Sequence, residues 1–318
     1  MNDLEQIESA AKLIARYMPP TPQYCWPLLC ERAGTEAWVK HENHTPIGAF
    51  KVRGGLVFME DLKALRGDVS GVIAATRGNH GQSIAFAARA LGLKSVVVVP
   101  HGNSVEKNRS MRALGAELIE HGEDFNAAHD HAKSLAAREG LYMVPSFDPL
   151  LVRGVATYSL EFLRGAADLD VVYVPIGLGS GICGMIAARD ALGRRTEVVG
   201  VVSERAAAYA LSFEAGRPIA TNSSDTMADG VAVRIPDPNA LEIIRRGAAR
   251  VVQVSEDEIK AAMRAYYTDT HNLAEGAGAA PLAALLKEKD SLKGKRAGVV
   301  LSGGNVDAPV FRAVLEEG

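Results

Sequence analysis

The 318-residue sequence has few cysteines, no long apolar run and no excess of positive charge, and each shortage excludes a class of protein. Cys25, Cys30 and Cys183 are too few and too irregularly spaced for a disulfide framework or a zinc cluster. No stretch approaches the roughly 20 consecutive apolar residues that span a bilayer, and residues 1–17 carry acids early, unlike a secretory signal. The net charge of −3 gives no field that would attract nucleic acid or an anionic membrane. We therefore expect a cytoplasmic protein whose partners are small molecules or further copies of itself.

The sequence does contain short apolar, β-branched runs that alternate with longer alanine-rich stretches of helical spacing. This alternation predicts an α/β fold of parallel-type sheets flanked by crossover helices. A chain of 318 residues, 47% of them hydrophobic, can bury two moderate cores, so we expect two domains. Strands are predicted at 37–40, 71–76, 95–100, 117–120, 142–144, 171–175, 197–202, 251–254 and 297–301.

Two helix starts have clear local signals. Residues 79–91 place their apolar side chains on one face, and Gly92 follows as a stop signal. Ser255 precedes a run of acids that suits the positive end of a helix. The turn chemistry of residues 145–149, PSFDP, interrupts two periodic regions and predicts a boundary there.

The first motif with chemical potential is HENHTPIGAFKVRGG, residues 41–55, which places Lys51 between a strand and a helix. Phe50 and Val52 partly desolvate this lysine, which lowers its pKa and makes a neutral amine available for Schiff-base formation. A surface lysine at a helix start would look the same, so this motif alone decides nothing.

The second motif is ATRGNHGQS, residues 75–83, in which a strand runs into a helix through two glycines. Such a junction directs several backbone N–H groups toward one point at the positive end of the helix, which favours a carboxylate or a phosphate. The alternative is that Asn79 merely caps the helix and that His80 is a structural histidine.

The third motif is VVYVPIGLGSGICG, residues 171–184, a buried strand followed by glycines and a helix. Its glycines let the backbone approach a phosphate closely. A dinucleotide fingerprint is disfavoured because the next strand ends as VVGVV, without the acid that would bind a ribose. The other alternative is a tight turn without a ligand.

The fourth motif is GVVLSGGNVD, residues 298–307, where a hydrophobic strand ends in Ser302 and two glycines. Strand ends of this kind carry ligand contacts in open parallel sheets. A serine that caps the last helix is the alternative.

Taken together and in this order, the four motifs resemble the fold-type II pyridoxal-phosphate (PLP) enzymes, in particular the threonine dehydratase and serine racemase branch, over nearly the whole chain. The resemblance implies that Lys51 carries the cofactor as a Schiff base, that Phe50 packs on its ring and that Asn79 bonds the ring hydroxyl. It also implies that Ser302 faces the ring nitrogen. By the same resemblance the phosphate is held by Gly177, Leu178, Gly179, Ser180 and Gly181, and the substrate carboxylate is surrounded by Thr76, Gly78, Asn79 and His80.

The expected reaction is elimination from a β-hydroxy-L-amino acid of the L-threonine or L-serine type, which yields a 2-oxo acid and ammonia. A serine opposite the ring nitrogen does not stabilise a protonated ring as an aspartate would, so a long-lived carbanion is disfavoured. Lys51 is the expected catalytic base at Cα. Phenylserine and 3-hydroxyaspartate remain alternative substrates, and a non-catalytic PLP or amino-acid-binding module and a nucleotide-dependent oxidoreductase remain alternative functions.

Arg77 departs from the serine-rich loop of relatives and occupies the position where racemases of the branch carry a second base. A guanidinium stays protonated and cannot take that role, so racemisation is not expected. Arg77 either binds a substrate carboxylate bidentately or points into solvent. In the first case, a dicarboxylate such as 3-hydroxyaspartate becomes a strong candidate.

A second departure concerns metal binding. Relatives with a divalent cation beside the phosphate loop use acidic residues, but Val202 and Ala208 stand at the corresponding positions. Neither supplies a side-chain oxygen, so we expect no metal site there, although Glu204 is close in sequence.

The resemblance also implies a large PLP-binding domain, residues 1–47 and 147–318, and a small domain, residues 48–146, that closes over the active site. We expect a homodimer, because relatives are commonly dimers or tetramers. Because the chain ends soon after SGGNVD, we do not expect the regulatory domain of the biosynthetic threonine dehydratases.

Overall fold

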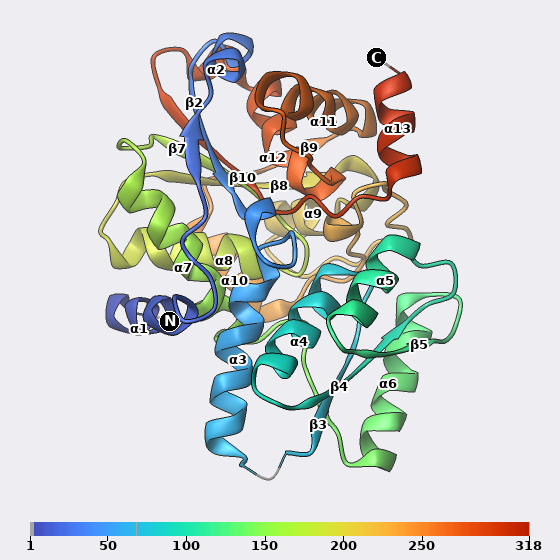
Figure 1. The fold of residues 1–318 in the computed structure, drawn as a ribbon. Coiled ribbons are helices and arrows are strands. Elements are labelled where there is room, and N and C mark those ends of the chain that lie inside the picture. Colours follow the sequence, from blue (N-terminus) through green and yellow to red (C-terminus); the bar gives the residue numbers. More distant parts are fainter. Residues whose placement is uncertain (1–2, 68, 318) are drawn as a thin grey trace.

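A computed structural model describes residues 3–67 and 69–317 and contains two sheets flanked by helices (Figure 1). The six-stranded sheet has the order β1-β2-β10-β7-β8-β9 and the four-stranded sheet the order β5-β4-β3-β6. The first sheet consists of β1 (Gln23–Cys25), β2 (Glu36–His41), β7 (Val171–Pro175), β8 (Glu197–Ser203), β9 (Arg250–Val254) and β10 (Arg296–Leu301). The second consists of β3 (Gly71–Ala75), β4 (Lys94–Val99), β5 (Glu117–Glu120) and β6 (Tyr142–Met143).

The α/β class is confirmed, and the nine predicted strands lie where the apolar runs indicated. The additional strand β1 pairs antiparallel with β2, whereas the other strand pairs of the described residues are parallel. β1 has only three residues, and none of them is buried, so it carries no hydrophobic period that sequence analysis could detect.

Helices cover both faces of each sheet. The described α-helices are α1 (Leu4–Ile14), α2 (Pro27–Ala33), α3 (Lys51–Leu65), α4 (Asn79–Ala90), α5 (Val105–Ala113), α6 (Phe125–Glu139), α7 (Pro149–Gly165), α8 (Ser180–Ala191), α9 (Ala208–Ala215), α10 (Pro238–Gly247), α11 (Glu256–Thr270), α12 (Gly276–Lys287) and α13 (Ala308–Glu316). Short 3-10 helices lie at Glu42–His44, Glu204–Ala206, Asp229–Val231 and Lys289–Leu292. The predicted capping box at Ser255 is present, and Gly92 has the expected left-handed backbone, with φ +71°.

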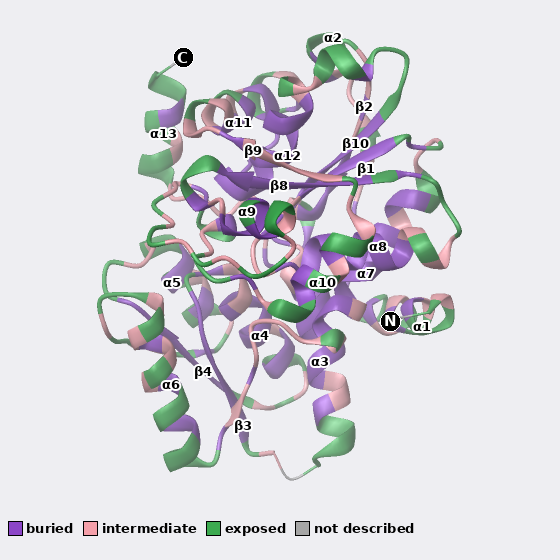
Figure 2. Ribbon diagram, turned by 180° about the vertical axis from the view of Figure 1, so that it is seen from behind, coloured by how far each residue is buried: buried purple, intermediate pink, exposed green. Residues whose placement is uncertain are grey.

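The six-stranded sheet separates two hydrophobic cores. One core packs α2, α11 and α12 against the sheet, and the other packs α7, α8, α9 and α10. The four-stranded sheet packs α1, α3 and α4 on one face and α6 on the other. Figure 2 shows buried residues concentrated along the strands and on the inner helix faces. None of the helices within the described ranges combines the length and the apolar character needed to cross a bilayer.

Helix α3 lies between the two sheets and packs against both α4 and α7. Its crossing with α7 is a contact between backbones. A Cβ on Gly154 would lie 2.3 Å from the Arg53 carbonyl oxygen, and a Cβ on Gly54 would lie 2.8 Å from the Leu151 carbonyl oxygen. Only glycine fits at both positions, so the helix that begins with Lys51 is fixed on α7. The domain limits 1–47, 48–146 and 147–318 stay a prediction.

Candidate active site

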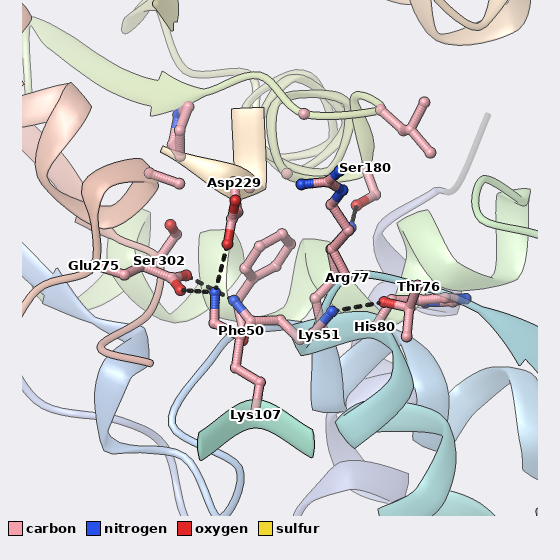
Figure 3. A pocket seen from close by; sticks show the side chains of 18 of the residues that line it. Phe50, Lys51, Thr76, Arg77, His80, Lys107, Ser180, Asp229, Glu275 and Ser302 are labelled. Atoms are coloured by element: carbon pink, nitrogen blue, oxygen red, sulfur yellow. Dashed lines mark hydrogen bonds and ion pairs between the residues drawn. The ribbon is translucent and has the colours of Figure 1, made fainter. Parts of the chain in front are cut away.

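A cavity lies where strands of both sheets end, as the parallel topology predicts (Figure 3). All four motifs contribute to it, although they are far apart in the chain. The cavity brings together the predicted site residues Phe50, Lys51, Thr76, Arg77, Gly78, Asn79, His80, Gly177, Leu178, Gly179, Ser180, Gly181 and Ser302. It is also lined by Lys107, Pro175, Asp229, Gly230, Glu275 and Ala277, which the motifs did not include.

Lys51 is the first residue of α3, and its amine lies inside the cavity. The Lys51 Nζ atom is 3.1 Å from Ser180 Oγ and 5.0 Å from the centre of the Phe50 ring. Burial lowers the pKa of Lys51 from 10.5 to about 8. Near neutral pH the side chain therefore has a neutral fraction far larger than that of an ordinary surface lysine, as a nucleophilic amine requires.

The glycine loop, residues 177–181, runs from β7 into α8. A Cβ on Gly177 would lie 2.3 Å from the Gly230 carbonyl oxygen, and Gly179 has a left-handed φ of +103°, so the loop needs glycine at both positions. Tyr209 donates a hydrogen bond of 3.0 Å to the Leu178 carbonyl oxygen, which anchors the loop. The first N–H groups of α8 have no partner within the helix, so the loop provides a binding site for an anion.

The loop between β3 and α4 provides a second helix N-terminus at the cavity. Gly78 is the residue before α4, and its N–H group donates to Thr76 Oγ1 at 2.9 Å. The His80 Nε2 atom is buried and has no hydrogen-bond partner among the described residues. Burial, together with the nearby Lys51, lowers the pKa of His80 from 6.5 to about 3, so the imidazole is neutral.

Asn79 does not act as a helix cap, which rules out that alternative. Its Nδ2 atom donates to Glu275 Oε1 at 2.6 Å, and its Oδ1 atom accepts from Asn305 Nδ2 at 2.8 Å. These two bonds fix the orientation of the amide and leave one N–H of Nδ2 for another acceptor. Ser302 does not cap the last helix either, since α13 follows Asp307, and the buried Ser302 lines the cavity.

Three charged residues in the cavity were missed by sequence analysis. Lys107 Nζ lies 3.2 Å from Asp229 Oδ2 and 3.6 Å from Glu275 Oε2 (Figure 3). Burial opposes the charge on Lys107, but Glu275 and Asp229 outweigh it and raise the pKa of the lysine. The two acids stand in similar tripeptides, ADG at 228–230 and AEG at 274–276, which is the one sequence signal that could have indicated them.

Arg77 lines the same cavity but is exposed to solvent. No hydrogen bond or ion pair joins its guanidinium to another residue within 3–67 and 69–317. Arg77 is therefore an exposed cation at the cavity without a partner among the described residues. Whether it binds a substrate carboxylate stays a prediction.

A cluster of largely buried charges surrounds Arg53 in the first turn of α3. The Arg53 side chain is fully buried and donates to Glu42 at 2.7 Å and to Glu161 at 2.7 Å. Lys40 Nζ donates to the same Glu161 carboxylate at 2.6 Å. Because Arg53 follows Lys51 by two residues, these ion pairs fix the first turn of α3 and with it the base of the lysine.

The chain is similar to proteins of known family in both sequence and structure. The model of a family described as pyridoxal-phosphate dependent enzyme matches residues 14–303. The L-threonine ammonia-lyase of Thermotoga maritima is 32% identical over 322 residues, which cover 100% of this chain and 79% of the relative. The L-threonine ammonia-lyase of Geobacter sulfurreducens is 38% identical over 292 residues, or 91% of this chain and 72% of the relative. The structure of the processed form of threonine deaminase isoform 2 from Solanum lycopersicum has a TM-score of 0.90 and 29% identity, and covers 99% of this chain and 94% of that one.

Proposed function

Since the chain belongs to the pyridoxal-phosphate dependent enzyme family, we propose that it is an ammonia-releasing lyase that converts a β-hydroxy-L-amino acid of the L-threonine or L-serine type into a 2-oxo acid and ammonia. The family and the cofactor that the four motifs indicated are confirmed. The observation that carries the reaction is the Lys51 amine, with its pKa near 8, in a cavity that two helix N-termini face.

The residues of the cavity fit pyridoxal phosphate. The glycine loop has no room for side chains at Gly177, the His80 Nε2 atom is buried without a partner among the described residues, and Phe50 offers an aromatic surface beside Lys51. Lys51 would hold the cofactor covalently, and the loop would hold its phosphate. The residues that would hold the cofactor are Phe50, Lys51, Asn79, Gly177, Leu178, Gly179, Ser180, Gly181 and Ser302.

When bound, the cofactor supplies an electron sink for the bond that breaks at the substrate Cα. Lys51 Nζ is the base that takes the Cα proton, and Ser180 Oγ at 3.1 Å orients this amine. Thr76 and Gly78 before α4, with Asn79 and His80 in its first turn, would surround the substrate carboxylate, which the free N–H groups at the start of the helix would bind. Neutral His80 supplies no charge, and Arg77 cannot act as a base on the opposite face, so elimination is favoured over racemisation.

The proposed reaction is tested by incubating the purified holoenzyme with a panel of hydroxy-amino acids that includes L-threonine, L-serine and phenylserine. We expect a 2-oxo acid and ammonia in equal amounts, and no D-amino acid. Bound cofactor without either product from any substrate would instead support a non-catalytic binding module.

We also propose that residues 1–47 and 147–318 form the large domain, that residues 48–146 form the small domain, and that the enzyme is a cytoplasmic homodimer. The support is the family, together with the separation of the two sheets along the chain. Size-exclusion chromatography with light scattering should give a molecular mass twice that of the 33.7 kDa chain.

A further inference from the structure

The charged residues of the cavity differ in whether they are already paired. Lys107 is buried and contacts both carboxylates of the cavity, Asp229 and Glu275. Lys51 would hold the cofactor and act as the base at the substrate Cα. Arg77 is the cationic lining residue that has no partner within the described part of the chain, and it lines the same cavity as Lys51 (Figure 3).

The two helix N-termini account for two anions of the reacting complex. The N-terminus of α8, with the glycine loop, suits the cofactor phosphate, and the N-terminus of α4 suits the α-carboxylate of the substrate. Both sites use backbone N–H groups and need no arginine. L-threonine and L-serine carry no further negative group, so with these substrates the Arg77 guanidinium would gain no partner.

We propose that Arg77 binds a second carboxylate, attached to the β-carbon of the substrate, so that the preferred substrate is a β-hydroxy dicarboxylic amino acid, 3-hydroxyaspartate. This inference rests on the proposed function and specifies its substrate. A guanidinium matches a carboxylate with two parallel N–H donors, which is the geometry that distinguishes arginine from lysine. The position of Arg77 between Thr76 and Gly78 connects this group directly to the loop that binds the α-carboxylate.

The reaction balances for this substrate as it does for serine. The Cα–H and Cβ–O bonds break with loss of water, and the resulting enamine takes up water and releases ammonia. The net change converts 3-hydroxyaspartate into oxaloacetate and ammonia, and no oxidant or reductant is required.

The test compares kcat/KM for 3-hydroxyaspartate, L-threonine and L-serine in the wild-type holoenzyme, Arg77→Gln and Arg77→Lys. We expect the wild type to prefer 3-hydroxyaspartate. We expect Arg77→Gln to lower kcat/KM for this substrate by about 10-fold to 150-fold, the usual effect of losing a hydrogen bond to a charged group. The kcat/KM of Arg77→Gln for L-serine should change by less than about threefold. Arg77→Lys should retain more activity on 3-hydroxyaspartate than Arg77→Gln, because lysine keeps the positive charge but lacks the two parallel N–H donors. Arg109→Gln, which removes an exposed arginine outside the cavity, is the matched control.

Binding gives a readout that does not depend on turnover. Calorimetry with succinate and butyrate should show that the wild-type holoenzyme binds the dicarboxylate more tightly, and that Arg77→Gln removes this difference.

The outcomes separate this inference from the proposed function. Turnover of L-threonine or L-serine without turnover of 3-hydroxyaspartate would overturn the inference and leave the proposed function intact. An equal loss on all substrates would place Arg77 at the α-carboxylate, and weaker cofactor binding would place it at the phosphate; both results overturn the inference. Absence of a 2-oxo acid from every substrate would overturn the proposed function and the inference with it.

Discussion

Two clusters of charged side chains flank Lys51, and they differ in how their charges are paired. The Arg53 cluster, which does not line the cavity, consists of Lys40, Glu42, Arg53 and Glu161. The cavity cluster consists of Arg77, Lys107, Asp229 and Glu275. Each has two cations and two carboxylates. In the Arg53 cluster both cations bind carboxylates at 2.6 to 2.7 Å, whereas in the cavity cluster Lys107 contacts both carboxylates and Arg77 contacts neither.

The difference separates charges that support the fold from charges that can bind a ligand. A fully paired, buried cluster holds its members in one arrangement and has no capacity left for another ion. A cluster with one unpaired cation at a cavity can bind an anion without first breaking an existing ion pair. The number of charges near a site is therefore less informative than their pairing.

The largest effect on activity should come from Lys51→Ala, which removes the reactive amine but leaves both charged clusters in place. We expect turnover to fall by at least about 10⁴-fold, because the same amine holds the cofactor and moves the Cα proton. Borohydride should no longer fix the cofactor to the protein, while the melting temperature of the cofactor-free protein should not fall. Retained turnover in this variant would contradict the assignment of Lys51.

Arg53→Met, in contrast, should mainly lower the stability of the fold, because Arg53 does not line the cavity. It leaves Glu42 buried without its principal partner, and breaking a buried ion pair in this way costs about 3–5 kcal/mol. The free energy of unfolding, measured in urea, should fall by this amount. Arg312→Met is the matched control, because Arg312 is exposed on α13 and Glu316 is its one ion-pair partner among residues 3–67 and 69–317; it should change stability by less than about 0.5 kcal/mol. Equal effects of the two substitutions would show that the Arg53 cluster does not stabilise the fold.

Gly177→Ala tests the glycine loop, which would bind the cofactor phosphate through backbone N–H groups and not through charged side chains. The new Cβ would lie 2.3 Å from the Gly230 carbonyl oxygen, so the loop has to move. We expect cofactor affinity to fall by about tenfold to 100-fold, as is typical when binding groups are displaced by about 1 Å. In Gly67→Ala the added Cβ meets nothing within 4 Å, and this control should bind the cofactor normally. Cofactor titrations followed by absorbance measure both variants.

The smallest effect concerns the pH dependence of cofactor attachment. The neutral Lys51 amine is the nucleophile, and its fraction rises with pH through the lowered pKa of about 8. The rate of attachment to cofactor-free protein should therefore rise with a midpoint near pH 8 and level off above it. A midpoint near the ordinary lysine value of 10.5 would show that burial does not shift this amine.

Sequence periodicity was sufficient for the α/β class, because buried parallel strands form continuous apolar runs that differ clearly from alanine-rich helices. It missed β1, which has three residues without a buried side. Local motifs were sufficient to predict that Lys51, residues 76–80, residues 177–181 and Ser302 share one cavity, because the two loops and Ser302 directly follow strands whose ends meet there and Lys51 opens a helix beside them. The roles of these residues stay predictions. Lys107, Asp229 and Glu275 do not directly follow strands, and their ion pairs form only when three distant segments fold against each other.

The contact between Gly54 and Gly154 has a consequence for engineering. Each of these glycines faces the backbone of the other helix, so a side chain at either one would push α3 off α7 and displace Lys51 with it. A library that randomises α3 to alter the substrate range would therefore lose most of its members to misplaced lysines. Diversity is better introduced at Arg77, which lines the cavity, is exposed and has no hydrogen-bond partner among the described residues.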